Sequence, residues 1–158
     1  GGAFESGTGD YVTLFEPTAS AFAAQGKGHI VTNMGLESGE VPYTTFMMRK
    51  DTIENEPGFA AAFVRAIYRA QKWVWAAGDE EVAYAMQSYF PDTDIATLSA
   101  VAKSYRATDS WTRVPTMTED AFTRLQDILD GAGELAARIE LSELVDNSFG
   151  EAAISEIG

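Results

Sequence analysis

The chain has 158 residues, of which 46% are hydrophobic and 11% aromatic, and this is enough apolar material for the core of one ordinary domain. Acidic residues outnumber basic residues by 24 to 11, and the formal net charge of -13 repels phosphate backbones and anionic lipid headgroups. Composition therefore argues against nucleic acid and membrane surfaces as partners, and the absence of cysteine excludes disulfides and zinc-thiolate sites.

Three short segments before residue 50 have the β-branched and aromatic composition of strands. They cover residues 11–15, 29–32 and 41–49. Pro17 predicts the start of a short helix over residues 18–25, and the glycines and serine of residues 35–40 predict a loop. We therefore expect an α/β fold in which three short strands come first.

After residue 50 the apolar residues recur about every 3.6 positions, which is the helical period. Pro57 and Gly78 delimit a long amphipathic helix, and Thr118 has the side chain of a helix cap. Arginines and a lysine interrupt the longest apolar stretch, so it is not a membrane span. Four helices and a last short turn are predicted over residues 57–77, 79–89, 94–106, 118–132 and 152–157.

Four segments, in this order, resemble solute-binding proteins of ABC importers from the nitrate/sulfonate/thiamine-precursor family. They are Gly9-Asp10-Tyr11-Val12-Thr13-Leu14-Phe15-Glu16-Pro17, Val41-Pro42-Tyr43-Thr44-Thr45-Phe46-Met47, residues 53–68 and Asp146-Asn147-Ser148-Phe149. The resemblance implies a two-lobed type II periplasmic-binding fold. Residues 1–40 would end the second lobe, and residues 41–158 would form the return crossover and the C-terminal helical part of the first lobe.

The same resemblance implies partners and a location. A periplasmic or otherwise extracytoplasmic, membrane-associated protein would capture a small polar solute and deliver it to an ABC permease, without a cofactor and without catalysis. The family's N-terminal half is absent here and would be a further partner. The start Gly1-Gly2-Ala3-Phe4 has neither an initiator methionine nor the features of a signal peptide, so we expect it to be an internal position of a longer chain.

Two other functions stay open. Enzymes that make the thiamine pyrimidine share this fold, although their expected histidine and cysteine chemistry contrasts with one histidine and no cysteine here. A helical interaction module is the other alternative, and the predicted strands argue against it.

Glu16 is the leading candidate for ligand binding, because it follows a predicted strand and precedes a helix, where open α/β sheets bind ligands. Its carboxylate would favour a nitrogenous heteroaromatic or an amine over a sulfonate or nitrate. Tyr43 could stack on such a ligand, and Thr13 and Thr18 could supply hydroxyl groups. The simpler interpretation is that Glu16 caps a helix and the others pack locally. The lone histidine, His29, makes a poor metal site.

Overall fold

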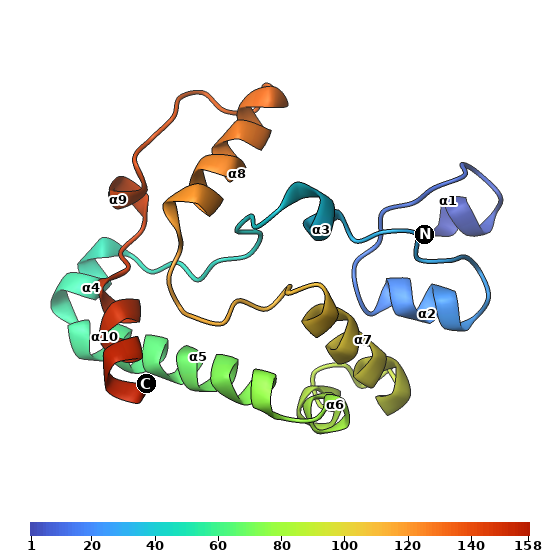
Figure 1. Cartoon of the computed structure of the whole chain (residues 1–158), viewed down its shortest axis with the longest axis horizontal. Helices are drawn as coiled ribbons and strands as arrows, with labels where there is room; N and C mark the ends of the chain where they lie inside the picture. Colours follow the sequence, from blue (N-terminus) through green and yellow to red (C-terminus); the bar gives the residue numbers. More distant parts are fainter. The chain divides into compact units, whose positions relative to one another are not determined.

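The computed structural model describes residues 1–158 and contains ten helices and no strand (Figure 1). The helices are α1 (Gly2–Glu5), α2 (Thr18–Ala24), α3 (Met34–Ser38), α4 (Lys50–Asn55), α5 (Pro57–Ala76), α6 (Asp79–Gln87), α7 (Ile95–Ala107), α8 (Glu119–Gly131), α9 (Leu141–Leu144) and α10 (Ser148–Ile157). None of them combines the length and the apolar character needed to cross a bilayer.

The expected α/β fold with three leading strands is wrong for this structure. Residues 11–15 and 29–32 are irregular, residues 41–49 contain no strand, and a short helix α3 replaces most of the predicted loop at 35–40. Strand composition is a local property, but a strand exists only where a second strand pairs with it. No such pairing forms in this chain, so the strand-like segments stay irregular.

The four long helices predicted after residue 50 are confirmed as α5 to α8, because their signals are local, whereas α4 and α9 were not predicted. Helix α5 begins at Pro57, and α8 begins after Thr118, whose hydroxyl accepts a hydrogen bond from the Ala121 N–H at 3.2 Å. Helices α2, α6 and α7 also form within a residue or two of their predicted ranges. The last turn is longer than expected and becomes α10.

The chain divides into two compact units. Unit 1 comprises Gly1–Met34 and Ala76–Ser110, and unit 2 comprises Gly35–Trp75 and Trp111–Gly158. The predicted assignment of residues 1–40 and 41–158 to two lobes concerns a longer protein, and it stays a prediction.

The core of unit 1 lies between α6 and α7, which pack against each other. Its buried side chains are Val82, Ala83, Leu98, Val101 and Ala102. At the far end of α7 the Arg106 guanidinium binds the Asp79 carboxylate and donates to the Ala77 carbonyl at 2.6 Å. These contacts join the start of α6 to the last turn of α7.

Unit 2 buries parts of α5, α8 and α10, namely Ala60, Tyr68, Ala121, Phe122, Gln126, Gly150 and Ala153. Two side-chain amides hold its long loops. Asn147 accepts from the Met117 N–H at 3.0 Å and donates to the Met117 carbonyl at 2.9 Å. Gln126 likewise accepts from the Ile139 N–H at 2.9 Å and donates to the Ile139 carbonyl at 3.1 Å. Each loop is therefore fixed by a reciprocal pair of hydrogen bonds.

Candidate functional site

A hollow of about 400 Å³ lies in unit 1, where α2 packs against α7. This volume falls within the range of about 300–1,000 Å³ that is usual for small-molecule sites. Helix α2 forms one wall, and the turn before α7 together with its first residues forms the other. The lining residues are Pro17, Thr18, Ala21, Phe22, Ala24, Gln25, Lys27, Asp92, Thr93, Asp94 and Thr97.

The local sequence explains why these walls are polar. Asp94 caps α7: one carboxylate oxygen accepts from the Thr97 N–H at 2.8 Å and the other from the Thr97 hydroxyl at 3.0 Å. The hydrogen bond from the Thr97 N–H, followed by that from its hydroxyl, lowers the pKa of Asp94 below its usual value. At neutral pH Asp94 is therefore ionised, and both of its carboxylate oxygens accept hydrogen bonds within the first turn of α7.

Of the charged residues in the lining, Lys27 and Asp94 are committed to other contacts. Lys27 forms an ion pair with Glu5 and also lies 5.2 Å from the centre of the Phe22 ring. Asp92 lies in the exposed turn before α7 and makes no hydrogen bond or ion pair. The hollow therefore presents one uncommitted carboxylate, accompanied by the Thr18 and Thr93 hydroxyls and the Gln25 amide.

Glu16 is half-buried and lies just before α2. Its two carboxylate oxygens accept hydrogen bonds from Ser20, one from the backbone N–H and one from the hydroxyl, both at 2.9 Å. Burial, and then the negative charge of Glu16, raises the pKa of Tyr105 in the same unit. Glu16 thus has the capping contacts of the simpler interpretation, and its contact with a ligand stays a prediction.

The other predicted site residues are in different surroundings. Thr18 lines the hollow, next to Pro17. Thr13 is exposed, and its hydroxyl lies 4.0 Å from the Met34 sulfur. Tyr43 belongs to unit 2, where its side chain is largely exposed. Of the four candidates, the structure therefore places Thr18 on the hollow, and the roles of all four stay predictions.

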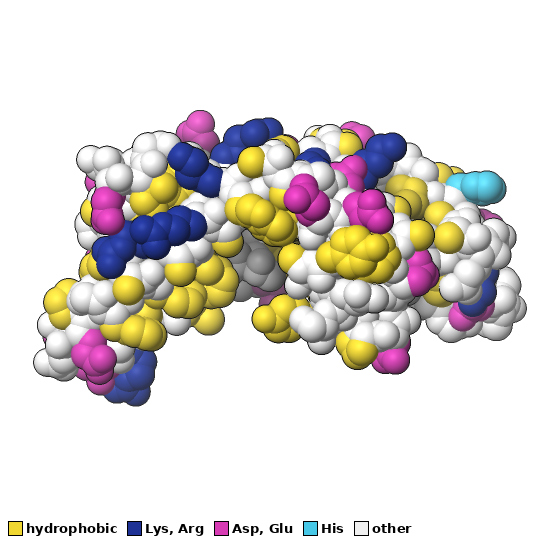
Figure 2. Space-filling model, turned by 90° about the horizontal axis from the view of Figure 1, so that it is seen from below, with side chains coloured by type: hydrophobic (Ala, Val, Ile, Leu, Met, Phe, Trp, Pro, Cys, Tyr) yellow, Lys and Arg dark blue, Asp and Glu magenta, His cyan; other side chains and the backbone are white.

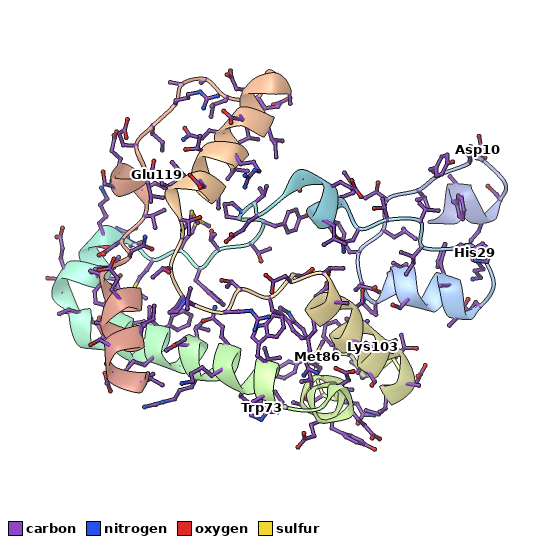
Figure 3. All side chains as sticks on the ribbon, viewed as in Figure 1. Asp10, His29, Trp73, Met86, Lys103 and Glu119 are labelled. Carbon is purple, nitrogen blue, oxygen red and sulfur yellow. The ribbon has the colours of Figure 1, made fainter.

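Sequence reasoning missed Asp92, Thr93 and Gln25, which contribute to the lining. The sequence signal that could have identified this wall is the run Pro91-Asp92-Thr93-Asp94, which separates two predicted helices and carries two carboxylates and a hydroxyl. The structure brings no three acidic or histidine side chains together as a metal-binding group, and His29 lies at the surface of unit 1 (Figure 3).

Comparison with known proteins identifies the family. Residues 2–88 match the model of the NMT1-like family, and this is more than half of the chain. The chain belongs to the NMT1-like family. The match includes α2 and ends before the Asp92–Thr97 wall of the hollow.

A curated relative matches nearly the whole chain. YtlA of Bacillus subtilis (strain 168), provisionally named a binding protein, is 41% identical over 154 residues. The match covers 98% of this chain and 46% of YtlA, so the chain spans about half the length of that relative. No solved structure matches the chain significantly.

Proposed function

We propose that the chain is the C-terminal part of an extracytoplasmic solute-binding protein that delivers a small polar solute to an ABC importer. The observation that carries this proposal is the 41% identity, along 98% of the chain, to a protein named for binding. Membership of the NMT1-like family supports it independently. The role is capture and release without chemical change, since the relative is named for binding and not for a reaction.

The ligand class follows from the hollow in unit 1. Asp92 offers an uncommitted carboxylate beside two hydroxyls and an amide, and a hydrogen bond to a charged group is about twice as strong as a neutral one. The net charge of -13 repels anionic solutes. Both features favour an amine or a protonated nitrogen heterocycle over a sulfonate or nitrate.

The partners and the location belong to this proposal. The solute would pass to a membrane permease, and the remaining part of the same protein would supply the second wall of the binding cleft. Ligand contacts from both parts would then favour a closed state. The site of action would be periplasmic or otherwise extracytoplasmic.

A helical interaction module is a second candidate function. The specific observation in its favour is the absence of any strand, since the predicted strands were the argument against it. The two functions differ in one measurable respect, because an interaction module has no need to bind a small solute.

Calorimetry with the protein from the complete reading frame tests the proposal. The solutes are an aminopyrimidine, a primary alkylamine, taurine and nitrate. We expect a roughly micromolar Kd for one of the first two and no binding of the two anions. Tight binding of taurine or nitrate, or no binding of any amine or heterocycle, would contradict the proposed ligand class.

A matched pair of variants locates the site. Asp92→Asn should weaken binding of the cationic solute by about 1.5–3 kcal/mol, the usual contribution of a hydrogen bond to a charged group. Glu80→Gln removes another exposed carboxylate of unit 1, on α6 and outside the hollow, and should change the affinity less than twofold. Equal effects of the two variants would show that only overall charge matters.

A further inference from the structure

Lys27 is the one cation in the lining of the hollow, and the end of α2 fixes its backbone. Gly26 follows α2 with a φ of +68°, a conformation that glycine adopts readily. The Lys27 N–H donates to the Phe22 carbonyl at 3.0 Å, and the Gly26 N–H donates to the Ala23 carbonyl at 3.1 Å. This pair of hydrogen bonds is the Schellman motif, which ends many helices. Lys27 is therefore fixed close to Phe22, another residue of the lining.

The Lys27 ammonium is held by an aromatic ring and by a carboxylate of unit 1. Its nitrogen lies 5.2 Å from the centre of the Phe22 ring and forms an ion pair with Glu5. Glu5 is the last residue of α1 and does not line the hollow. The Phe4 ring packs against Gly28, where a Cβ atom would meet it at 3.2 Å, and this contact holds α1 beside the segment that carries Lys27. Glu5 thus neutralises a cation of the hollow from outside it.

This ion pair decides which charge the hollow presents. On the face that Figure 2 draws, Lys and Arg side chains lie among Asp and Glu side chains, so local pairs shape the field at any one site. With Glu5 in place, the charge of Lys27 is compensated and the carboxylate of Asp92 attracts a cation. Without Glu5, an amine would meet a like charge, whereas a zwitterion would find a partner for each of its two charges.

We propose that Glu5 determines the charge selectivity of the hollow: by pairing with Lys27, it makes a simple amine a better solute than a zwitterionic amino acid. This inference rests on the proposed function, in which the hollow binds a cationic or nitrogenous solute. Glu5 is a positioning residue, because it acts on the solute through the charge of Lys27 and does not line the hollow itself.

Calorimetry on the protein from the complete reading frame compares propylamine with β-alanine, a zwitterion of similar size. In Glu5→Gln we expect propylamine to bind about fivefold more weakly and β-alanine to bind more tightly, because Lys27 lacks its partner. Both shifts should shrink in about 0.5 M salt, which screens exposed charges. The side chains of the pair are 40% and 38% exposed, and such pairs contribute little to folding, so the variant should unfold as the parent does.

A double variant separates charge from structure. Glu5→Gln/Lys27→Gln removes both charges and should return the propylamine affinity to within about twofold of the parent, whereas structural damage at Glu5 would persist. Asp10→Asn is the matched control, since Asp10 is an exposed carboxylate of unit 1 outside the lining (Figure 3). It should change the ratio of the two Kd values less than about twofold.

The outcomes that would overturn the inference are distinct. Equal losses for both solutes in Glu5→Gln, or a double variant as weak as Glu5→Gln, would reduce Glu5 to a structural role. Carbodiimide coupling of the solute-free protein, which joins a carboxylate to a neighbouring amine as an amide, should link Glu5 to Lys27 by mass spectrometry. No link would overturn the inference whatever binds. A link in a protein that binds no amine would overturn the proposed ligand class, and with it the inference, while leaving the ion pair established.

Discussion

One added methyl group at Gly150 should destabilise unit 2. Gly150 is buried in the first turn of α10, where the helix lies against the loop at residues 115–117. A Cβ atom at this position would lie 2.8 Å from the Thr116 methyl carbon and 3.1 Å from the Pro115 carbonyl carbon, and closer still to the Pro115 oxygen. Ordinary contacts are 3.4–4 Å, so the backbone of either the loop or the helix has to move.

Two opposing terms decide the magnitude for Gly150→Ala. The intrinsic helix preference favours alanine over glycine by up to about 1 kcal/mol. Overpacking of a well-packed site costs about 1–3 kcal/mol, and here the clashing atoms are largely backbone, which relaxes poorly. Movement of the loop also strains the two hydrogen bonds between Asn147 and Met117. We expect a net loss of about 1–2 kcal/mol in the free energy of unfolding.

Urea unfolding followed by tryptophan fluorescence measures this loss. The three tryptophans, Trp73, Trp75 and Trp111, all belong to unit 2, so their emission reports the unit that contains Gly150. Gly131→Ala is the control, because a Cβ at this helical position has no neighbour within 4 Å. It should be neutral or slightly stabilising. A Gly150→Ala protein as stable as the parent, with an unchanged m-value, would refute the packing argument.

Two further predictions concern single hydrogen-bonding side chains. Asn147→Ala leaves the N–H and the carbonyl of Met117 without their partner, and it should lower the free energy of unfolding by about 1–3 kcal/mol. The same fluorescence transition in urea measures this loss. An unchanged midpoint would show that water replaces the amide. Because the pKa of Asp94 is lowered from 3.8, its contribution to stability is present above that value and is lost as pH falls through the lower folded-state pKa. Asp94→Asn keeps a cap but removes the titration, so helicity in urea by circular dichroism should favour the parent near neutral pH, with a difference that shrinks below about pH 3.8. A difference that grows on acidification would refute this sign.

The helices could be predicted because their determinants are close in sequence. Proline at the first position of α5, a threonine cap on α8 and the 3.6-residue spacing of apolar side chains all act within a few turns. The capping interpretation of Glu16 could also be reached from the sequence, because its hydrogen-bond partner Ser20 lies only about one helical turn away. The composition argued only against nucleic acid and anionic lipid surfaces as partners, whereas the prediction of a nitrogenous solute came from the carboxylate of Glu16.

Tertiary structure alone decided the strands and the hollow. Residues 11–15 and 41–49 have strand composition, but pairing requires a second segment brought from elsewhere, and none pairs with them in this chain.

The hollow requires α2 to meet the turn before α7, about seventy residues later, and this spacing leaves no periodic signal in the sequence. Asp92 became a candidate because packing places it on that wall, whereas Asp94, two residues later, is held by its own helix. The sequence by itself determined the longer helices and which residues carry charge, since both properties are local, but it did not predict the short helices α1, α3, α4 and α9. Which carboxylate faces an open hollow depends on packing between distant segments, and only the folded chain decides it.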